Sequence, residues 1–233
     1  MEMEKIQPKF LMMENSGDNS KEVVYMYGVV GSGWYGDISA QGVREMLDNV
    51  TANEIEVHIN SFGGDAFEGI AICNYLRSHP SNITAVIDGI AASAASLIAM
   101  GANKVVMPSN TTMMVHRAAT YAYGNADSLE KQAKMLRDVD SALIQSYKNR
   151  FNGEFFELEA LLDNETYMTA EKAKSYGLCD EIVDSIENSV ESKTEEPQQV
   201  EPTTAATTEN EDKRAINAER ASSFMNSLLK TIK

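Results

Sequence analysis

Residues 89–101 read GIAASAASLIAMG, and this stretch decides the fold. The β-branched run Ile83–Ile87 before it predicts a strand, and the small and aliphatic residues after Ser93 predict a helix. A strand that runs into a helix places the Ser93 hydroxyl beside the free N–H groups of the first helical turn, which favour negative charge. Ser93 is therefore a candidate nucleophile, although a serine at a helix start is more often a cap. Ser96, one helical turn further on, is expected to be dispensable.

Strands and helices are also predicted to alternate on both sides of this stretch. The pattern predicts strands at Val23–Val30, Ile55–Ile59, Val105–Met107 and Thr112–Val115, and helices at Ser39–Asn49, Asp65–Arg77 and Asp127–Phe151. Repeated strand–helix units favour right-handed crossovers and a largely parallel sheet, so we expect an α/β fold.

The chain has 233 residues, enough for one sizeable domain with appendages. We expect an N-terminal segment at 1–20 and a globular domain at 21–185. Residues 186–211 are mainly Glu, Thr, Pro, Gln and Asn, which predicts a disordered acidic linker. Residues 212–233 regain an apolar stripe and are either an amphipathic docking helix on this tether or a frayed tail.

A net charge of −15 disfavours both nucleic acid and an anionic membrane surface as partners. No apolar run reaches the ~18 residues that a membrane span needs, and no secretory leader is recognisable. Cys73 and Cys179 match no metal-ligand spacing and predict buried thiols in a reducing compartment. We therefore expect a cytoplasmic protein without a metal or another cofactor.

A serine needs a base that accepts its proton, and the chain offers three histidines. His58 lies on the strand face opposite the aliphatic residues, where it is expected to pack or meet solvent. His79 precedes a proline at a predicted helix end, which favours a role in a turn. His116 ends a predicted strand, and sites in open α/β sheets form at strand ends, so His116 is the candidate base.

Two further parts of a serine-hydrolase site have candidates. Asp163 and Glu165 could each orient the histidine, and spacing alone does not choose between them. The glycines of the segment 61–64, SFGG, could direct N–H groups at a bound carbonyl. This segment lacks the third glycine of a dinucleotide loop and the Gly-Lys-Ser/Thr of a phosphate loop, and Ser93 is not in a G-x-S-x-G elbow.

Four motifs in order, INSFGGDAFEG, GIAASAAS, MMVHRA and ETYMTAEKAKSYGLCDEI, resemble the proteolytic subunit of the Clp protease. The resemblance is greatest to the Clp-like head-maturation proteases of tailed phages and spans about residues 23–183. It implies a ClpP/crotonase-type fold of repeated ββα units. It also implies that Ser93 is the nucleophile, His116 the base and Glu165 the acid, and that the N–H groups of Gly64 and Ala94 form the oxyanion hole.

The chain departs from the family pattern at three of these motifs. Phe62 stands where a proline usually precedes the glycine pair, and Arg117-Ala118 replaces the usual Gln-Pro after the histidine. Glutamate in place of aspartate lengthens the acid by one methylene, which changes the carboxylate geometry more than its role.

The resemblance implies an ATP-independent serine endopeptidase that processes capsid and scaffold proteins inside an assembling phage head, in the bacterial host cytoplasm. It further implies a homo-oligomeric ring. Three alternatives remain open: a housekeeping peptidase subunit that works with an ATP-driven unfoldase, a non-catalytic oligomeric assembly protein of the same fold, and a crotonase-like acyl-CoA enzyme.

Overall fold

The computed structural model describes residues 11–15, 21–32 and 37–183. The expected linker at 186–211 and docking helix at 212–233 lie outside these residues. The described strands are β1 (Leu11–Asn15), β2 (Lys21–Val30), β3 (Glu54–Gly64), β4 (Asn82–Ala92), β5 (Lys104–Pro108), β6 (Thr112–Val115), β7 (Thr166–Thr169) and β8 (Glu181–Val183). The described helices are α1 (Ala40–Leu47), α2 (Ala66–Ser78), α3 (Ala94–Ala99), α4 (Ala126–Lys148), α5 (Phe155–Asp163) and α6 (Ala170–Ser175).

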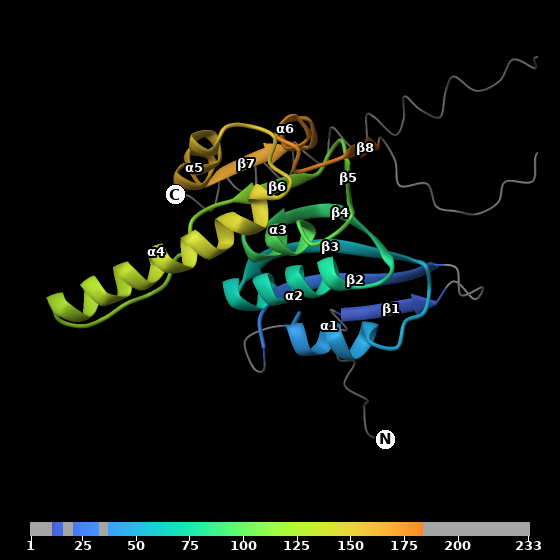
Figure 1. Ribbon diagram of the computed structural model, residues 1–233, viewed down its shortest axis with the longest axis horizontal. Coiled ribbons are helices and arrows are strands. Elements are labelled where there is room, and N and C mark those ends of the chain that lie inside the picture. The colour runs from blue at the N-terminus through green and yellow to red at the C-terminus, as the bar shows by residue number, and fades with distance from the viewer. Residues whose placement is uncertain (1–10, 16–20, 33–36, 184–233) are drawn as a thin grey trace, which may run out of the picture. The chain divides into compact units, whose positions relative to one another are not determined.

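The strands form one sheet in the order β1-β2-β3-β4-β5-β8, with β6 paired to β4 and β7 paired to β6 (Figure 1). Strands β2, β3, β4, β5 and β8 run parallel, whereas β1 and β7 each pair antiparallel with one neighbour. The predicted α/β fold with a largely parallel sheet is thereby confirmed.

Local sequence explains where the first helices begin. Ser39 caps α1, since its Oγ accepts a hydrogen bond from the Gly42 N–H at 3.0 Å. Asp65 caps α2 in the same way and accepts from the Phe67 N–H at 2.7 Å. Both helices start within a residue or two of the predicted position.

A hydrophobic core fills the space between the sheet and the helices. Its fully buried members include Ile55, Val57 and Ile59 of β3, which alternate along the strand as predicted. Both Cys73 and Cys179 are free and buried. None of the described helices combines the length and the apolar character needed to cross a bilayer.

Strand β4 changes partner along its length. Its first half, Thr84–Val86, pairs with β5, and its last three residues, Ile90–Ala92, pair with β6. The chain then enters α3 directly. This branch point brings the ends of β4 and β6 side by side, and it is the feature of the fold that positions the candidate site.

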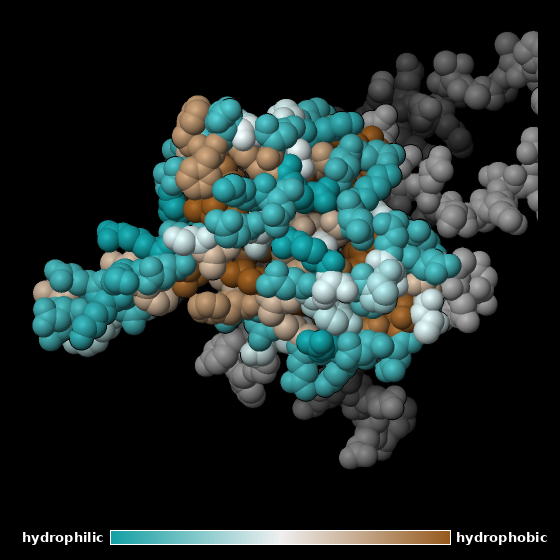
Figure 2. Space-filling view, viewed as in Figure 1, coloured by the Kyte–Doolittle hydropathy of each residue, from teal (hydrophilic) through white to brown (hydrophobic). Residues whose placement is uncertain are grey.

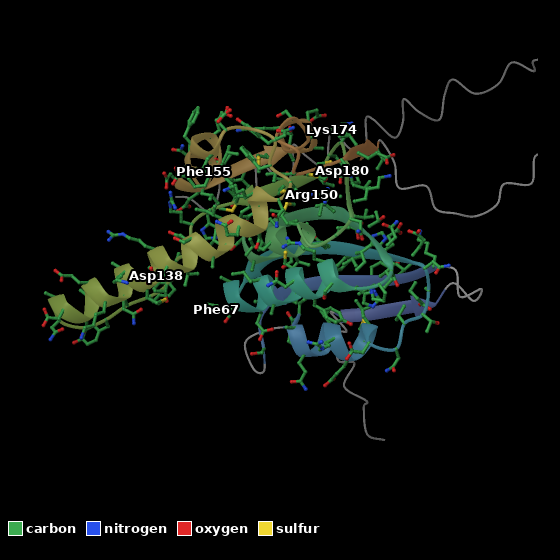
Figure 3. All side chains as sticks on the ribbon, in the orientation of Figure 1. Phe67, Asp138, Arg150, Phe155, Lys174 and Asp180 are labelled. Carbon is green, nitrogen blue, oxygen red and sulfur yellow. The ribbon has the colours of Figure 1, made fainter. Side chains whose placement is uncertain are left out.

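Helix α4 extends away from the sheet over its N-terminal half (Figure 1), where residues 126–135 are exposed. Its C-terminal half is anchored, and Val139, Leu143 and Tyr147 are buried. Just beyond the helix, Arg150 contacts Asp180 in an ion pair and donates to the Ala102 carbonyl at 2.9 Å (Figure 3).

Several elements differ from the sequence-based expectations. The glycine pair 63–64 ends β3 rather than forming a separate turn, because positive φ angles of 92° and 150° let the strand continue past a register shift against β2. Strand β1 lies within the segment 1–20, where no periodicity indicated it. Helix α5 and strands β7 and β8 were also not predicted, since each is short.

Candidate active site

Ser93 joins β4 to α3 in an unusual backbone conformation. Its φ is 55° and its ψ is −125°, a region that residues other than glycine rarely adopt. Its N–H donates to the Met114 carbonyl of β6 at 2.9 Å. Such strain costs on the order of 1–3 kcal/mol, persists only where surrounding contacts enforce it, and occurs often at functional sites.

His116 follows β6 and lies next to Ser93. Since β4 and β6 run parallel with Ala92 opposite Met114, their carboxyl ends meet at the same edge of the sheet. The His116 Nε2 atom lies 2.7 Å from the Ser93 Oγ atom. The predicted nucleophile and base are therefore in direct hydrogen-bond contact, the arrangement that lets an imidazole accept a serine proton.

The two candidate acids lie in different surroundings. In the antiparallel ladder between β6 and β7 the last pair is Val115 with Thr166, and His116 and Glu165 are the residues next to this pair. Glu165 is exposed and has a φ of 46°. Within residues 37–183, no hydrogen bond joins the Glu165 and His116 side chains. The structure thus places Glu165 at the same end of this ladder as His116, without a hydrogen bond between their side chains.

Asp163 instead contacts Arg117, the residue after His116, in a short ion pair. The hydrogen bond from Arg117 lowers the pKa of the Asp163 carboxyl, which keeps it ionised. Arg117 also lies 3.8 Å from Asp140 of α4 and 4.0 Å from Glu159 of α5. Arg117, where the family pattern has glutamine, therefore links the segment after His116 to two helices.

Of the two expected oxyanion donors, Ala94 follows Ser93 directly, and Gly64 lines the same cavity as Ser93. Ala94 is the first residue of α3, where a backbone N–H has no acceptor within the helix. The glycine pair of β3 packs against it: a Cβ atom on Gly63 would lie 2.8 Å from the Ala94 nitrogen and 2.5 Å from the Ala92 oxygen. Only glycine permits this approach. At Gly64 a Cβ atom would lie 2.0 Å from the Val30 oxygen.

A cavity of about 240 Å³ opens beside Ser93 and His116. Leu97 of α3 and Leu136, Val139, Leu143 and Tyr147 of α4 form most of its apolar wall. The lining also includes the segment 117–120 and Phe67, which is labelled in Figure 3 at the N-terminal end of α2. Apolar surface gathers where α4 meets the rest of the domain, whereas the free part of α4 is mostly hydrophilic (Figure 2).

His58 does not meet solvent as one alternative expected. It is 7% exposed, and its two ring nitrogens lie 2.8 Å from Asp88 and 2.9 Å from Glu56. Burial alone would lower the pKa of His58, but hydrogen bonds to the two carboxylates outweigh it and raise the pKa to about 9. The alternation of residues along β3 correctly places His58 on the face opposite the aliphatic residues. Its contact with Asp88 of β4 was not indicated by the sequence.

His79 keeps the local role predicted for it. Its ring nitrogens contact the Leu47 carbonyl at 3.3 Å and the Ser81 N–H at 3.2 Å. Of the three histidines, His116 alone contacts Ser93.

Comparisons with known proteins show the family of this chain. The sequence is 31% identical over 134 residues to the ATP-dependent Clp protease proteolytic subunit 1 of Protochlamydia amoebophila, over 55% of this chain. It is 28% identical over 134 residues to the ATP-dependent Clp protease proteolytic subunit of Deinococcus radiodurans, over 56% of this chain. The chain spans 65% of the length of each of these relatives. The sequence model of the Clp protease family matches residues 19–186, and this chain belongs to that family.

Proposed function

We propose that this chain is a serine endopeptidase with Ser93 as nucleophile, His116 as base and Glu165 as acid. The observation that supports it most is the 2.7 Å contact between Ser93 Oγ and His116 Nε2, at a strained junction of strand and helix beside an apolar cavity. A crotonase-like acyl-CoA enzyme does not need this serine–histidine pair.

The reaction runs through an acyl-enzyme. Ser93 Oγ attacks the peptide carbonyl while His116 Nε2 takes the hydroxyl proton. The N–H groups of Gly64 and Ala94 bind the oxygen that becomes negatively charged. His116 returns the proton to the leaving amine, and water then hydrolyses the ester by the same steps. Glu165 stabilises the charged imidazole once its side chain turns toward His116.

The cavity suggests the substrate. Its apolar wall of leucine, valine and tyrosine suits a medium-sized apolar side chain next to the cleaved bond, held by burial of apolar surface. We further propose that the substrates are capsid and scaffold proteins in an assembling phage head, processed without ATP by a homo-oligomeric ring. The phage-like motifs around Ser93 and Glu165 favour this role.

The names of the two relatives support a second candidate, a peptidase subunit that works with an ATP-driven partner. The two candidates differ in their partners and not in the chemistry. Cleavage, without ATP, of a capsid protein encoded next to the gene of this chain supports the phage role. Cleavage of folded proteins only with ATP and an added unfoldase supports the second.

A fluorophosphonate probe tests the enzymatic part of the proposal. The wild type is expected to be labelled at Ser93 and to hydrolyse a fluorogenic peptide with an apolar residue before the cleaved bond. Ser93→Ala and His116→Ala should abolish both reactions, and the exposed Ser141→Ala on α4 should leave both unchanged. Unlabelled wild type, or labelled Ser93→Ala, contradicts the assignment.

A further inference from the structure

The carbonyl oxygen of Ser93 receives an unusual number of hydrogen bonds. The Ser96 N–H donates to it at 2.9 Å and the Leu97 N–H at 3.3 Å. The Ser96 hydroxyl also donates to it, at 2.6 Å. A helical serine often returns its hydroxyl to the preceding turn, so this last contact alone is ordinary.

Tyr147 makes the arrangement distinctive. Its hydroxyl comes from α4, 51 residues further along the chain, and lies 2.7 Å from the Ser96 hydroxyl oxygen. The single hydroxyl hydrogen of Ser96 is already donated to Ser93, so Tyr147 must be the donor. The contacts form a directed chain from the Tyr147 O–H through the Ser96 O–H to the Ser93 carbonyl oxygen.

This chain is shielded from water. Ser96 is 0% exposed and Tyr147 is 1% exposed. Burial raises the pKa of the Tyr147 hydroxyl, which keeps it protonated and able to donate. Hydrogen bonds in series polarise one another, and the effect is greatest where the local dielectric is low.

The Ser93 carbonyl belongs to the same planar peptide group as the Ala94 N–H. Fixing the carbonyl therefore fixes the direction of that N–H, and polarising the carbonyl makes the N–H a stronger donor. Because Ser93 has a strained φ, this peptide plane needs such support.

We propose that Ser96 and Tyr147 are positioning residues that orient and polarise the Ser93–Ala94 peptide group, so that the Ala94 N–H stabilises the oxyanion. This inference rests on the proposed peptidase function. It revises the expectation that Ser96 is dispensable, and it gives α4 a part in the reaction beyond lining the cavity.

The test compares Ser96→Ala, Tyr147→Phe and the double variant with wild type on the fluorogenic peptide. Removing an oxyanion donor outright costs about 10²–10³ in kcat, and loosening one should cost a fraction of this. We expect kcat to fall about tenfold in Ser96→Ala and about threefold in Tyr147→Phe, with KM within about twofold of wild type. The double variant should match Ser96→Ala, because Tyr147 acts through Ser96.

Ser146→Ala is the matched control, since it removes a buried hydroxyl from α4 that contacts Cys73. It should keep the wild-type kcat. Tyr147→Phe keeps the packing of the ring, so it addresses the hydroxyl even if Ser96→Ala proves unstable. Wild-type kcat in Ser96→Ala and Tyr147→Phe, or equal losses in Ser146→Ala, would overturn the proposal.

A readout independent of turnover separates this inference from the proposed function. In protein labelled with ¹⁵N-alanine, the Ala94 amide resonance should move in Ser96→Ala and Tyr147→Phe and stay in place in Ser146→Ala. If wild type fails to react with the fluorophosphonate, the proposed peptidase is wrong. An Ala94 resonance that does not move in Ser96→Ala overturns the positioning role whether or not the wild type is active.

Discussion

Replacing His58 with glutamine should remove a pH-dependent part of the stability. Both ring nitrogens of His58 face carboxylates, and a neutral imidazole can donate to only one of them, so the network favours the charged form. The His58 hydrogen bond in turn lowers the pKa of Glu56 to about 2. Lys21, 2.9 Å from Glu56, and Asp88 complete a cluster of two cations and two anions.

The magnitude follows from the pKa of His58. A rise from 6.5 to about 9 on folding corresponds to roughly 3 kcal/mol. The lowered pKa of Glu56 arises from the same His58–Glu56 hydrogen bond, so it contributes no separate free energy. Since the folded-state pKa of His58 is the higher one, its contribution is complete below about pH 6.5 and disappears as the pH rises through about 9.

Urea unfolding followed by circular dichroism measures this contribution between pH 6 and 9.5, at one fixed protein concentration because assembly shifts apparent stability. The free energy of unfolding of wild type should fall by about 2–3 kcal/mol more than that of His58→Gln over this range. His79→Gln, which removes a histidine bonded to backbone groups, should follow wild type. Parallel pH curves for wild type and His58→Gln would refute the reasoning.

Three further outcomes are expected. Glu165→Gln should lower kcat by roughly two to four orders of magnitude and Asp163→Asn far less, when kcat is calculated from the concentration of active sites found by titration. The reverse order of the two losses would make Asp163 the acid. Gly63→Ala should lose hydrolysis and thermal stability, because its methyl would lie 2.5 Å from a backbone oxygen, whereas Gly89→Ala, whose methyl meets only a side-chain amide, should retain both. Deleting 187–233 should leave fluorophosphonate labelling intact but weaken co-sedimentation with assembling capsid shells; full co-sedimentation would argue against a docking tail.

The main elements of the fold could be predicted because their patterns are long and periodic. Strand β3 and helix α2 have alternating or helical apolar spacing and a recognisable cap at Asp65. Ser93 and His116 could be singled out because each follows a strand. Their contact depends on the pairing of β4 with β6, which no local pattern encodes.

The parts that were missed depend on partners distant in the chain. The Ser96–Tyr147 contact spans 51 residues, and Tyr147 alone reads as one more apolar position of a long helix. Asp88 likewise meets His58 across neighbouring strands, 30 residues away. In both cases the sequence supplies suitable polar groups, and only the tertiary structure brings them within hydrogen-bond distance.

Strand β6 bears on the proposed choice of Glu165 over Asp163. This strand of four residues pairs on one side with β4, which leads to Ser93, and on the other with β7, which follows Glu165. A ladder fixes which residues face each other, and a slip of one position would turn every side chain to the opposite face. The register that brings His116 to Ser93 therefore also leaves Glu165 next to the last pair, Val115–Thr166, at the end of the ladder where His116 lies.

Asp163 is the last residue of α5, two residues before Glu165, and it forms an ion pair with Arg117. A carboxylate already paired with a guanidinium has less negative charge to offer an imidazolium, whereas Glu165 forms no ion pair with any residue of the range 37–183. The register and the charges thus support the proposal of Glu165 as the acid, and the Arg117–Asp163 ion pair links the segment after His116 to α5.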